Sequence, residues 1–185
     1  MVVQIAAELV GAATQLHSSG ELYAGTALVR QELEVQYLLA AFGRDRQSAA
    51  SWILSTRSQR ENNFRPSKLR DAGGFRRDDY RHHCDITGHP TPLGRVVLRS
   101  SSDRERTLGL AWRDLAQHAL DLSYQVLQAS SAVGVLEQVG PTVDAAAGPV
   151  AAWLEQDQLL VASIDLDPAT DPPDDDQGAA ATSSR

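Results

Sequence analysis

Apolar residues recur at steps of three and four along the first 42 residues of the chain. The first set lies on one helical face and consists of Val2, Ile5, Leu9, Ala13 and Leu16. This spacing is typical of an amphipathic helix, and Gly20 is a suitable C-terminal stop. The stretch 22–42 repeats the pattern, is rich in helix-forming residues and ends at Gly43. The pattern therefore predicts two successive helices.

The longest periodic segment lies in the second half of the chain. Its eight apolar positions alternate in steps of three and four: Leu108, Trp112, Leu115, Ala119, Leu122, Val126, Ala129 and Val133. A stripe of this length predicts a helix at the centre of a bundle. Gly140 and Pro141 are expected to break it, and a last helix is expected to begin at Pro149 and to reach Ile164.

The pattern weakens between these long helices. Asp45 can cap a third helix that carries Ala49, Trp52 and Ile53. Prolines and glycines then interrupt residues 57–101, where only short helices fit, around 66–71 and 78–85. The interruptions predict a largely irregular insertion.

Together these elements predict an all-α fold, a bundle of about four to five helices over residues 1–165. The insertion at about 57–101 lies between the third helix and the long central one. Residues 166–185 consist mainly of Asp, Pro, Ala, Ser and Thr without an apolar period. Such a segment buries too little apolar surface to fold, so we expect a disordered acidic tail.

Charge is distributed unevenly along the chain. The net charge is -7, yet residues 44–106 hold 14 of the 17 basic residues. Sixteen of the basic residues are Arg, which favours bidentate contacts to phosphate or carboxylate, although a GC-rich genome produces the same bias without a functional reason. A basic middle segment favours a polyanionic partner.

Other classes of protein are disfavoured. The N-terminal segment lacks the basic residues of a secretory signal, and no apolar stretch is long enough to cross a bilayer. Cys84 is the single cysteine, which suits a reducing compartment. We therefore expect a cytoplasmic protein without membrane contact. Phosphate loops and dinucleotide fingerprints are absent, so no cofactor is predicted.

The segment His82-His83-Cys84-Asp85, followed by His89, contains ligand types that suit zinc. Adjacent residues on a helix point about 100° apart, so His82, His83 and Cys84 cannot all face one ion without unwinding. No metal site is predicted here.

Two segments share the spacing of Arg, four residues and His: Arg77 with His82, and Arg113 with His118. The spacing resembles the Arg-polar-x-x-x-His motif of HEPN domains, helical bundles that include metal-independent RNA-cleaving toxins and inactive binding proteins. Five residues of a continuous helix leave Arg113 and His118 about 140° apart. Arg77 and His82 lie in the irregular insertion, where the backbone could bring them together, so they are the better catalytic candidates, with His89 nearby.

A second resemblance spans residues 22 to about 130. The segment Leu28-Val29-Arg30-Gln31-Glu32-Leu33-Glu34, then Tyr80 and Gly88-His89-Pro90, looks like an uncharacterised bacterial helical family with a buried Arg and Glu on one helix. The spacing of Arg30 and Glu34 favours an ion pair on one helix face. Arg30, Glu34 and Tyr80 are thus expected to form a structural polar site, beside which His89 and Pro90 dock.

The HEPN resemblance implies a protein that binds or cleaves RNA, and a bacterial stress or phage-defence system is the expected setting. If the protein is an enzyme, the expected activity is that of a metal-independent endoribonuclease. The alternative is a non-enzymatic helical interaction module whose partner is another protein or a second copy of the chain. Convergence of Arg30, Glu34, Tyr80 and His89 on one pocket would favour a site over the interaction module.

Overall fold

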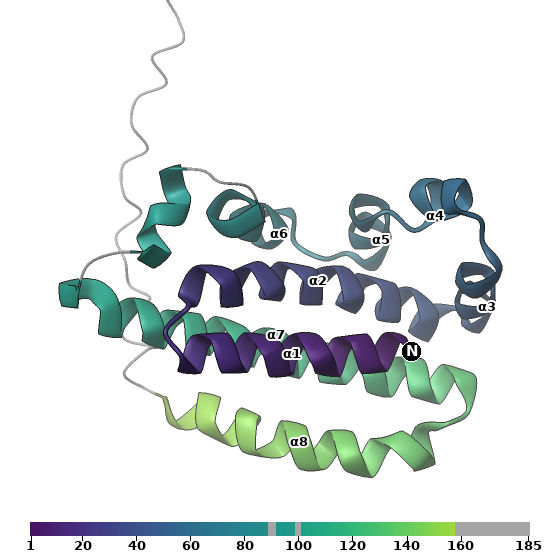
Figure 1. Ribbon diagram of the computed structural model, residues 1–185. Helices are drawn as coiled ribbons and strands as arrows, with labels where there is room; N and C mark the ends of the chain where they lie inside the picture. Colours follow the sequence, from purple (N-terminus) through teal and green to yellow (C-terminus); the bar gives the residue numbers. More distant parts are fainter. Residues whose placement is uncertain (89–91, 99–100, 158–185) are drawn as a thin grey trace, which may run out of the picture.

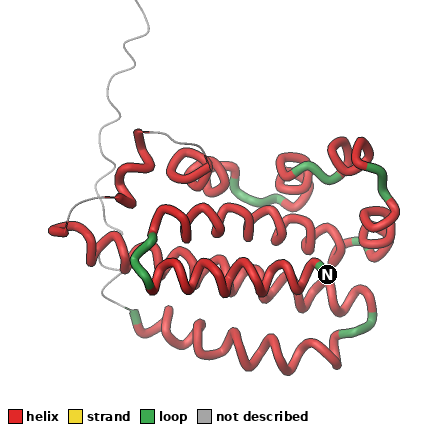
Figure 2. Tube along the Cα trace, in the orientation of Figure 1, coloured by secondary structure: helices red, strands yellow, loops and turns green. Residues whose placement is uncertain are grey.

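The computed structural model describes residues 1–88, 92–98 and 101–157 of the chain (Figure 1). These residues form eight α-helices and no β-strand (Figure 2), which confirms the all-α fold. The helices outnumber the four or five that were predicted. The four long ones are α1 Val2–Ser18, α2 Leu22–Arg44, α7 Ser101–Val133 and α8 Leu136–Gln156.

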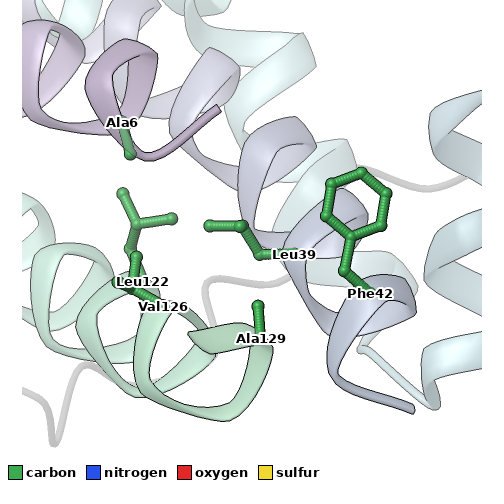
Figure 3. Close-up of a cluster of buried hydrophobic side chains, with 6 residues drawn as sticks. All are labelled: Ala6, Leu39, Phe42, Leu122, Val126 and Ala129. Carbon is green, nitrogen blue, oxygen red and sulfur yellow. The ribbon is translucent and has the colours of Figure 1, made fainter. Parts of the chain in front are cut away.

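Helices α2 and α7 form the centre of the bundle, since α1 packs against both and α8 packs against α7. Their contact buries a cluster of apolar side chains (Figure 3): Ala6, Leu39, Phe42, Leu122, Val126 and Ala129. A second cluster joins the other half of α7 to α1 and α2 through Leu115, Val29 and Ala13. Leu115 and Leu122 are both buried, as the periodicity of this helix predicts.

Four short helices follow α2 along the chain, and α3, α5 and α6 pack on it (Figure 1). Their bounds are α3 Arg46–Leu54, α4 Arg57–Asn63, α5 Pro66–Gly73 and α6 Arg77–His83. A π-helical turn, η1 Cys84–Gly88, and a 3₁₀ helix, η2 Pro92–Leu98, come next. The prediction that 57–101 is mainly irregular is therefore wrong for its described part, whereas α5 and α6 confirm the two short helices expected around 66–71 and 78–85.

Local signals explain these short helices. Thr56 and Gln59 form a reciprocal capping box at the start of α4. Helix α5 begins with Pro66 and ends at Gly74, whose φ of 70° is a left-handed conformation that glycine adopts without strain. Leu69 then anchors α5 on α2, where it contacts Leu33 and Tyr37 in one buried cluster. Prolines and glycines thus separate helices here and do not prevent them.

Helix α8 differs from its predicted course. It begins at Leu136 and contains both Pro141 and Pro149, so neither proline breaks or starts it. Val139 and Val143 pack on the core, and this burial compensates for the backbone hydrogen bond that Pro141 cannot donate. The helix ends at Gln156, and the predicted extension to Ile164 lies largely outside the described residues.

The acidic tail at 166–185 and the candidate residue His89 also lie outside the described residues. Among the helices that the structure describes, none has the length and apolarity needed to span a membrane.

Candidate functional site

Two histidines and two aspartates meet where α6 faces α7. Helix α6 contributes Asp79 and His83, and α7 contributes Asp114 and His118. Within each pair the residues are four apart and lie on one helix face. The Nε2 atoms of the two histidines are 3.1 Å apart. We call these four residues the Asp-His cluster.

Both carboxylates approach both imidazoles. The Oδ1 atom of Asp114 lies 3.5 Å from Nε2 of His83 and 3.4 Å from Nε2 of His118. The Oδ1 atom of Asp79 lies 3.8 Å from each of the same nitrogens. The ligand atoms of Asp79, His83 and His118 all lie within 4.8 Å of one another, and Asp114 approaches both nitrogens as well.

The cluster lies at the boundary between the core and the surface. His83 is 1% exposed and His118 is 6% exposed, whereas the side chains of Asp79 and Asp114 are 41% and 34% exposed. Burial alone would lower the pKa of His118, but its interaction with Asp114 outweighs this effect and raises the pKa. Burial would likewise raise the pKa of Asp114, and contacts with His118 and His83 lower it instead.

Glu32 of α2 lies behind the cluster, in the core. Its side chain is 1% exposed, and neither carboxylate oxygen has a hydrogen-bond partner among the described residues. Burial raises the pKa of Glu32 to about 8, while the charge of His118 opposes this shift and that of Asp114 adds to it. The charges of His118 and Asp114, the two α7 members of the cluster, therefore both influence the pKa of Glu32.

A pocket of about 680 Å³ opens over the cluster, and His83 and Asp114 belong to its lining. Helix α7 also contributes Arg106, Arg113 and Gln117 to its wall. The Nη1 atom of Arg113 is buried and has no hydrogen-bond partner among the described residues. A buried guanidinium nitrogen without an acceptor is costly, so this position favours an anionic ligand.

The predicted trio of Arg30, Glu34 and Tyr80 does come together. The Nη1 atom of Arg30 donates to Oε1 of Glu34 at 2.7 Å and to the Tyr80 hydroxyl at 3.0 Å. The hydroxyl in turn donates to the same Oε1 atom at 2.9 Å. These groups satisfy one another, which is consistent with a structural role for the trio. His89, expected beside them, lies outside the described residues.

Arg77 and His82, the predicted catalytic pair, do not lie in irregular backbone. Both belong to the continuous helix α6, where a step of five residues separates their directions by about 140°. Arg77 forms an ion pair with Asp71 at 3.1 Å, and His82 is exposed at the rim of the pocket. The structure therefore does not bring this pair together.

The zinc ligand types in the sequence include His83, and the second Arg-His spacing includes His118, but neither pattern singles out Asp79 or Asp114 or connects the two segments. Each cluster half is an Asp followed by a His four residues later, a spacing that directs two ligand types to one helix face. This signal occurs at Asp79 with His83 and at Asp114 with His118. It could have been found, but the meeting of the two halves depends on tertiary structure.

Comparisons with protein-family models, with curated proteins and with solved structures give no match. No relative therefore assigns a role to any of these residues.

Proposed function

We propose that this chain binds RNA, and that the pocket between α6 and α7 holds a phosphate of the bound strand. The observation that carries the proposal is Arg113, a residue of the pocket wall whose buried Nη1 atom has no hydrogen-bond partner among the described residues. A phosphate oxygen is a suitable acceptor for a guanidinium group. Arg106, exposed on the same wall, can contact a neighbouring phosphate.

The charge pattern and the HEPN resemblance support RNA over a small anion. Residues 44–106, which contribute α6 and the start of α7, are strongly basic within an acidic chain. Stretches of this kind attract polyanions, because each phosphate that is neutralised releases counterions. The floor of the pocket adds His83 and Asp114, groups that can act on a phosphodiester as well as hold it.

Fluorescence anisotropy with labelled single-stranded RNA tests the proposal. We expect Arg113→Gln to weaken binding by about tenfold, the loss of one charge-assisted contact. Arg57→Gln is the matched control, because the Arg57 side chain is 90% exposed on α4 and lies outside the pocket lining. Equal affinities in all three proteins, or no RNA binding by the unaltered chain, would refute the proposal.

The same samples test cleavage. Attack by the RNA 2′-hydroxyl on the adjacent phosphorus breaks the bond to the 5′ oxygen and yields a 2′,3′-cyclic phosphate and a free 5′-hydroxyl. Gel analysis of labelled RNA, with and without chelator, reveals these ends and any metal requirement. Binding without cleavage would place the chain among RNA-binding proteins that lack nuclease activity.

The second candidate is a non-enzymatic interaction module in which the Asp-His cluster only joins α6 to α7. It is favoured by the nearly complete burial of His83 and His118, whose Nε2 atoms face each other. In that case Arg113→Gln changes no ligand affinity, and His118→Ala lowers the thermal stability alone.

A further inference from the structure

We propose that the Asp-His cluster is a binding site for a divalent transition-metal ion, with Zn²⁺ as the best fit. The ligand atoms are Nε2 of His83, Nε2 of His118 and a carboxylate oxygen of Asp79, which all lie within 4.8 Å of one another. Asp114 lies beside both nitrogens as a neighbouring anion and is not assigned as a ligand. This proposal goes beyond RNA binding and does not depend on it, because the ion would be held by groups that belong to the chain itself.

The spacing of the ligand atoms is the first argument. Bonds of 2.0–2.2 Å to a tetrahedral zinc ion place the ligand atoms about 3.3 Å apart. The two Nε2 atoms are 3.1 Å apart, and the ligand atoms of His83, His118 and Asp79 all lie within 4.8 Å of one another. Asp79 stands slightly farther away, at 3.8 Å from both nitrogens. The groups are therefore close to ligand positions before any ion enters.

The orientation of the imidazoles is the second argument. The two Nε2 atoms face each other, and only one of them can donate a hydrogen bond to the other, so the second presents a lone pair or a proton directed at its neighbour. A divalent cation instead accepts lone pairs from both nitrogens and attracts both carboxylates. Nitrogen and oxygen donors of this kind suit zinc and the neighbouring first-row ions.

Glu32 is the third and independent argument. Its carboxyl group is buried behind the cluster without a hydrogen-bond partner among the described residues, although its charge interacts with that of His118. Burying a carboxyl group in this way is unfavourable unless positive charge lies nearby. A cation among His83, His118 and the two aspartates would supply it. Glu32 is therefore a positioning residue in this proposal and is not assigned as a ligand.

The location of the site connects it to solvent. His83 and Asp114 line the pocket, so an ion can enter there, and the coordination position on the pocket side stays available to water or to an anion. Arg113 lies on the same wall with its unpartnered Nη1 atom. A cation and a guanidinium group in one pocket form a site suited to a phosphoryl group.

The test is a titration of the full-length protein with Zn²⁺ after removal of metal by a chelator. Isothermal titration calorimetry should show one ion per chain. Asp79→Asn and His118→Ala should each weaken binding by at least tenfold, and Glu32→Gln should weaken it by about tenfold or more, the usual effect of losing a supporting group. His82→Ala is the matched control, since His82 is exposed next to His83 and outside the cluster, and it should leave the affinity unchanged within about twofold.

A spectroscopic measurement covers variants that fold poorly. Co²⁺ added to the metal-free unaltered protein should give the intense visible absorption of a tetrahedral site, and Zn²⁺ should displace it. Asp79→Asn is expected to keep its fold because that side chain is 41% exposed, and its absorption should be weaker or shifted. Absence of Zn²⁺ binding by the unaltered chain, or equal losses in His82→Ala and His118→Ala, would overturn the proposal.

The metal site and the RNA site can fail separately. Metal titrations contain no RNA, and anisotropy in the presence of chelator measures RNA binding without metal. Loss of Zn²⁺ binding in His118→Ala with RNA affinity retained would support the metal site and separate it from RNA binding. RNA binding by a chain that takes up no Zn²⁺ would reject the metal site alone.

Discussion

Single residues in the interior of this bundle show where burial and charge are in conflict. Glu32 and His17 are both almost completely buried, and their polar side-chain atoms have no hydrogen-bond partner among the described residues. Burial raises the pKa of Glu32 to about 8 and lowers the pKa of His17. Both groups thus favour the neutral form in the folded protein, which makes the stability of the metal-free protein depend on pH.

Glu32 determines the sign of this dependence in one range. An unfolded chain releases the Glu32 proton near the ordinary value of 4.5, whereas the folded chain holds it until about pH 8. Between these values the folded state binds more protons, so its stability falls as the pH rises and levels off above about 8. We expect Glu32→Gln to remove this part of the decline. Melting temperatures of the chelator-treated protein between about pH 5 and pH 8 measure it.

The matched control is Glu8→Gln, which makes the same chemical change at an exposed position of α1. Because Glu8 is exposed and its carboxylate accepts a hydrogen bond of 3.1 Å from Gln4 of its own helix, this variant should keep the slope of the unaltered protein. Parallel slopes for Glu32→Gln and Glu8→Gln would mean that burial does not perturb the Glu32 carboxyl group.

At the scale of one element, α7 carries both the core and the candidate site. Its apolar face buries Leu115 and Leu122 against α1 and α2, and a neighbouring part of its surface presents Arg113 and Asp114 to the pocket. The core side fixes the rotation of the helix about its axis. That rotation in turn directs His118 toward His83, so packing along the length of α7 positions the cluster.

Leu122→Ala tests this dependence on packing. Leu122 is 3% exposed in the central cluster, and truncation should lower the free energy of unfolding by about 2 to 5 kcal/mol through the cavity that it leaves. Tyr124→Ala lies two residues away on the same helix, but Tyr124 is 57% exposed and its loss should change stability by less than about 0.5 kcal/mol. Chemical denaturation monitored by circular dichroism compares the free energies of unfolding of the two variants. Equal losses of stability would contradict the assigned core face.

At the scale of the whole molecule, periodicity predicted the helices whose apolar residues recur at regular spacing. The existence of the two N-terminal helices and of α7 follows from apolar spacing. The face predicted for α1 is only partly correct, because Ile5 is 40% exposed while Ala6 and Ala13 are buried. Helix α2 is buried on more than one side, since it packs on α1 and α7 as well as on α5 and α6.

Helix α8 did not follow from apolar spacing, since Pro141 and Pro149 signal a break locally while packing of Val139 and Val143 on the core maintains the helix. Tertiary contacts outweighed local propensity there.

The candidate site shows the same limit. The spacing of Arg30 and Glu34 on one helix predicts their ion pair, and Tyr80 joins this pair as expected. His83 and His118 are 35 positions apart, so no local pattern reports that their imidazoles meet. Arg77 and His82 were favoured because the segment around them looked irregular, but it forms a regular helix. Sites made by two elements depend on the packing of the chain between them.

The charge distribution of the whole chain leads to a last prediction about RNA. Residues 166–185 include the run Asp174-Asp175-Asp176, and acidic residues predominate from 155 onward. A tethered polyanion competes with RNA for the basic residues at a high effective concentration. We therefore expect a chain that ends at Asp165 to bind RNA more tightly than the full-length protein.

The difference should be largest at low ionic strength, because salt screens the tail and the RNA alike. In both proteins the affinity should fall steeply as salt rises, the signature of phosphate contacts.

A full-length protein with Asp174→Asn, Asp175→Asn and Asp176→Asn keeps the tail but removes the run of charge, so it should bind RNA almost as tightly as the shortened chain if competition is electrostatic. Arg113→Gln in the shortened chain should lose part of the gain, since the tail and the RNA would compete for that pocket. Anisotropy titrations at several salt concentrations decide the point, and identical salt dependence with and without the tail would show that the acidic residues do not reach the basic surface.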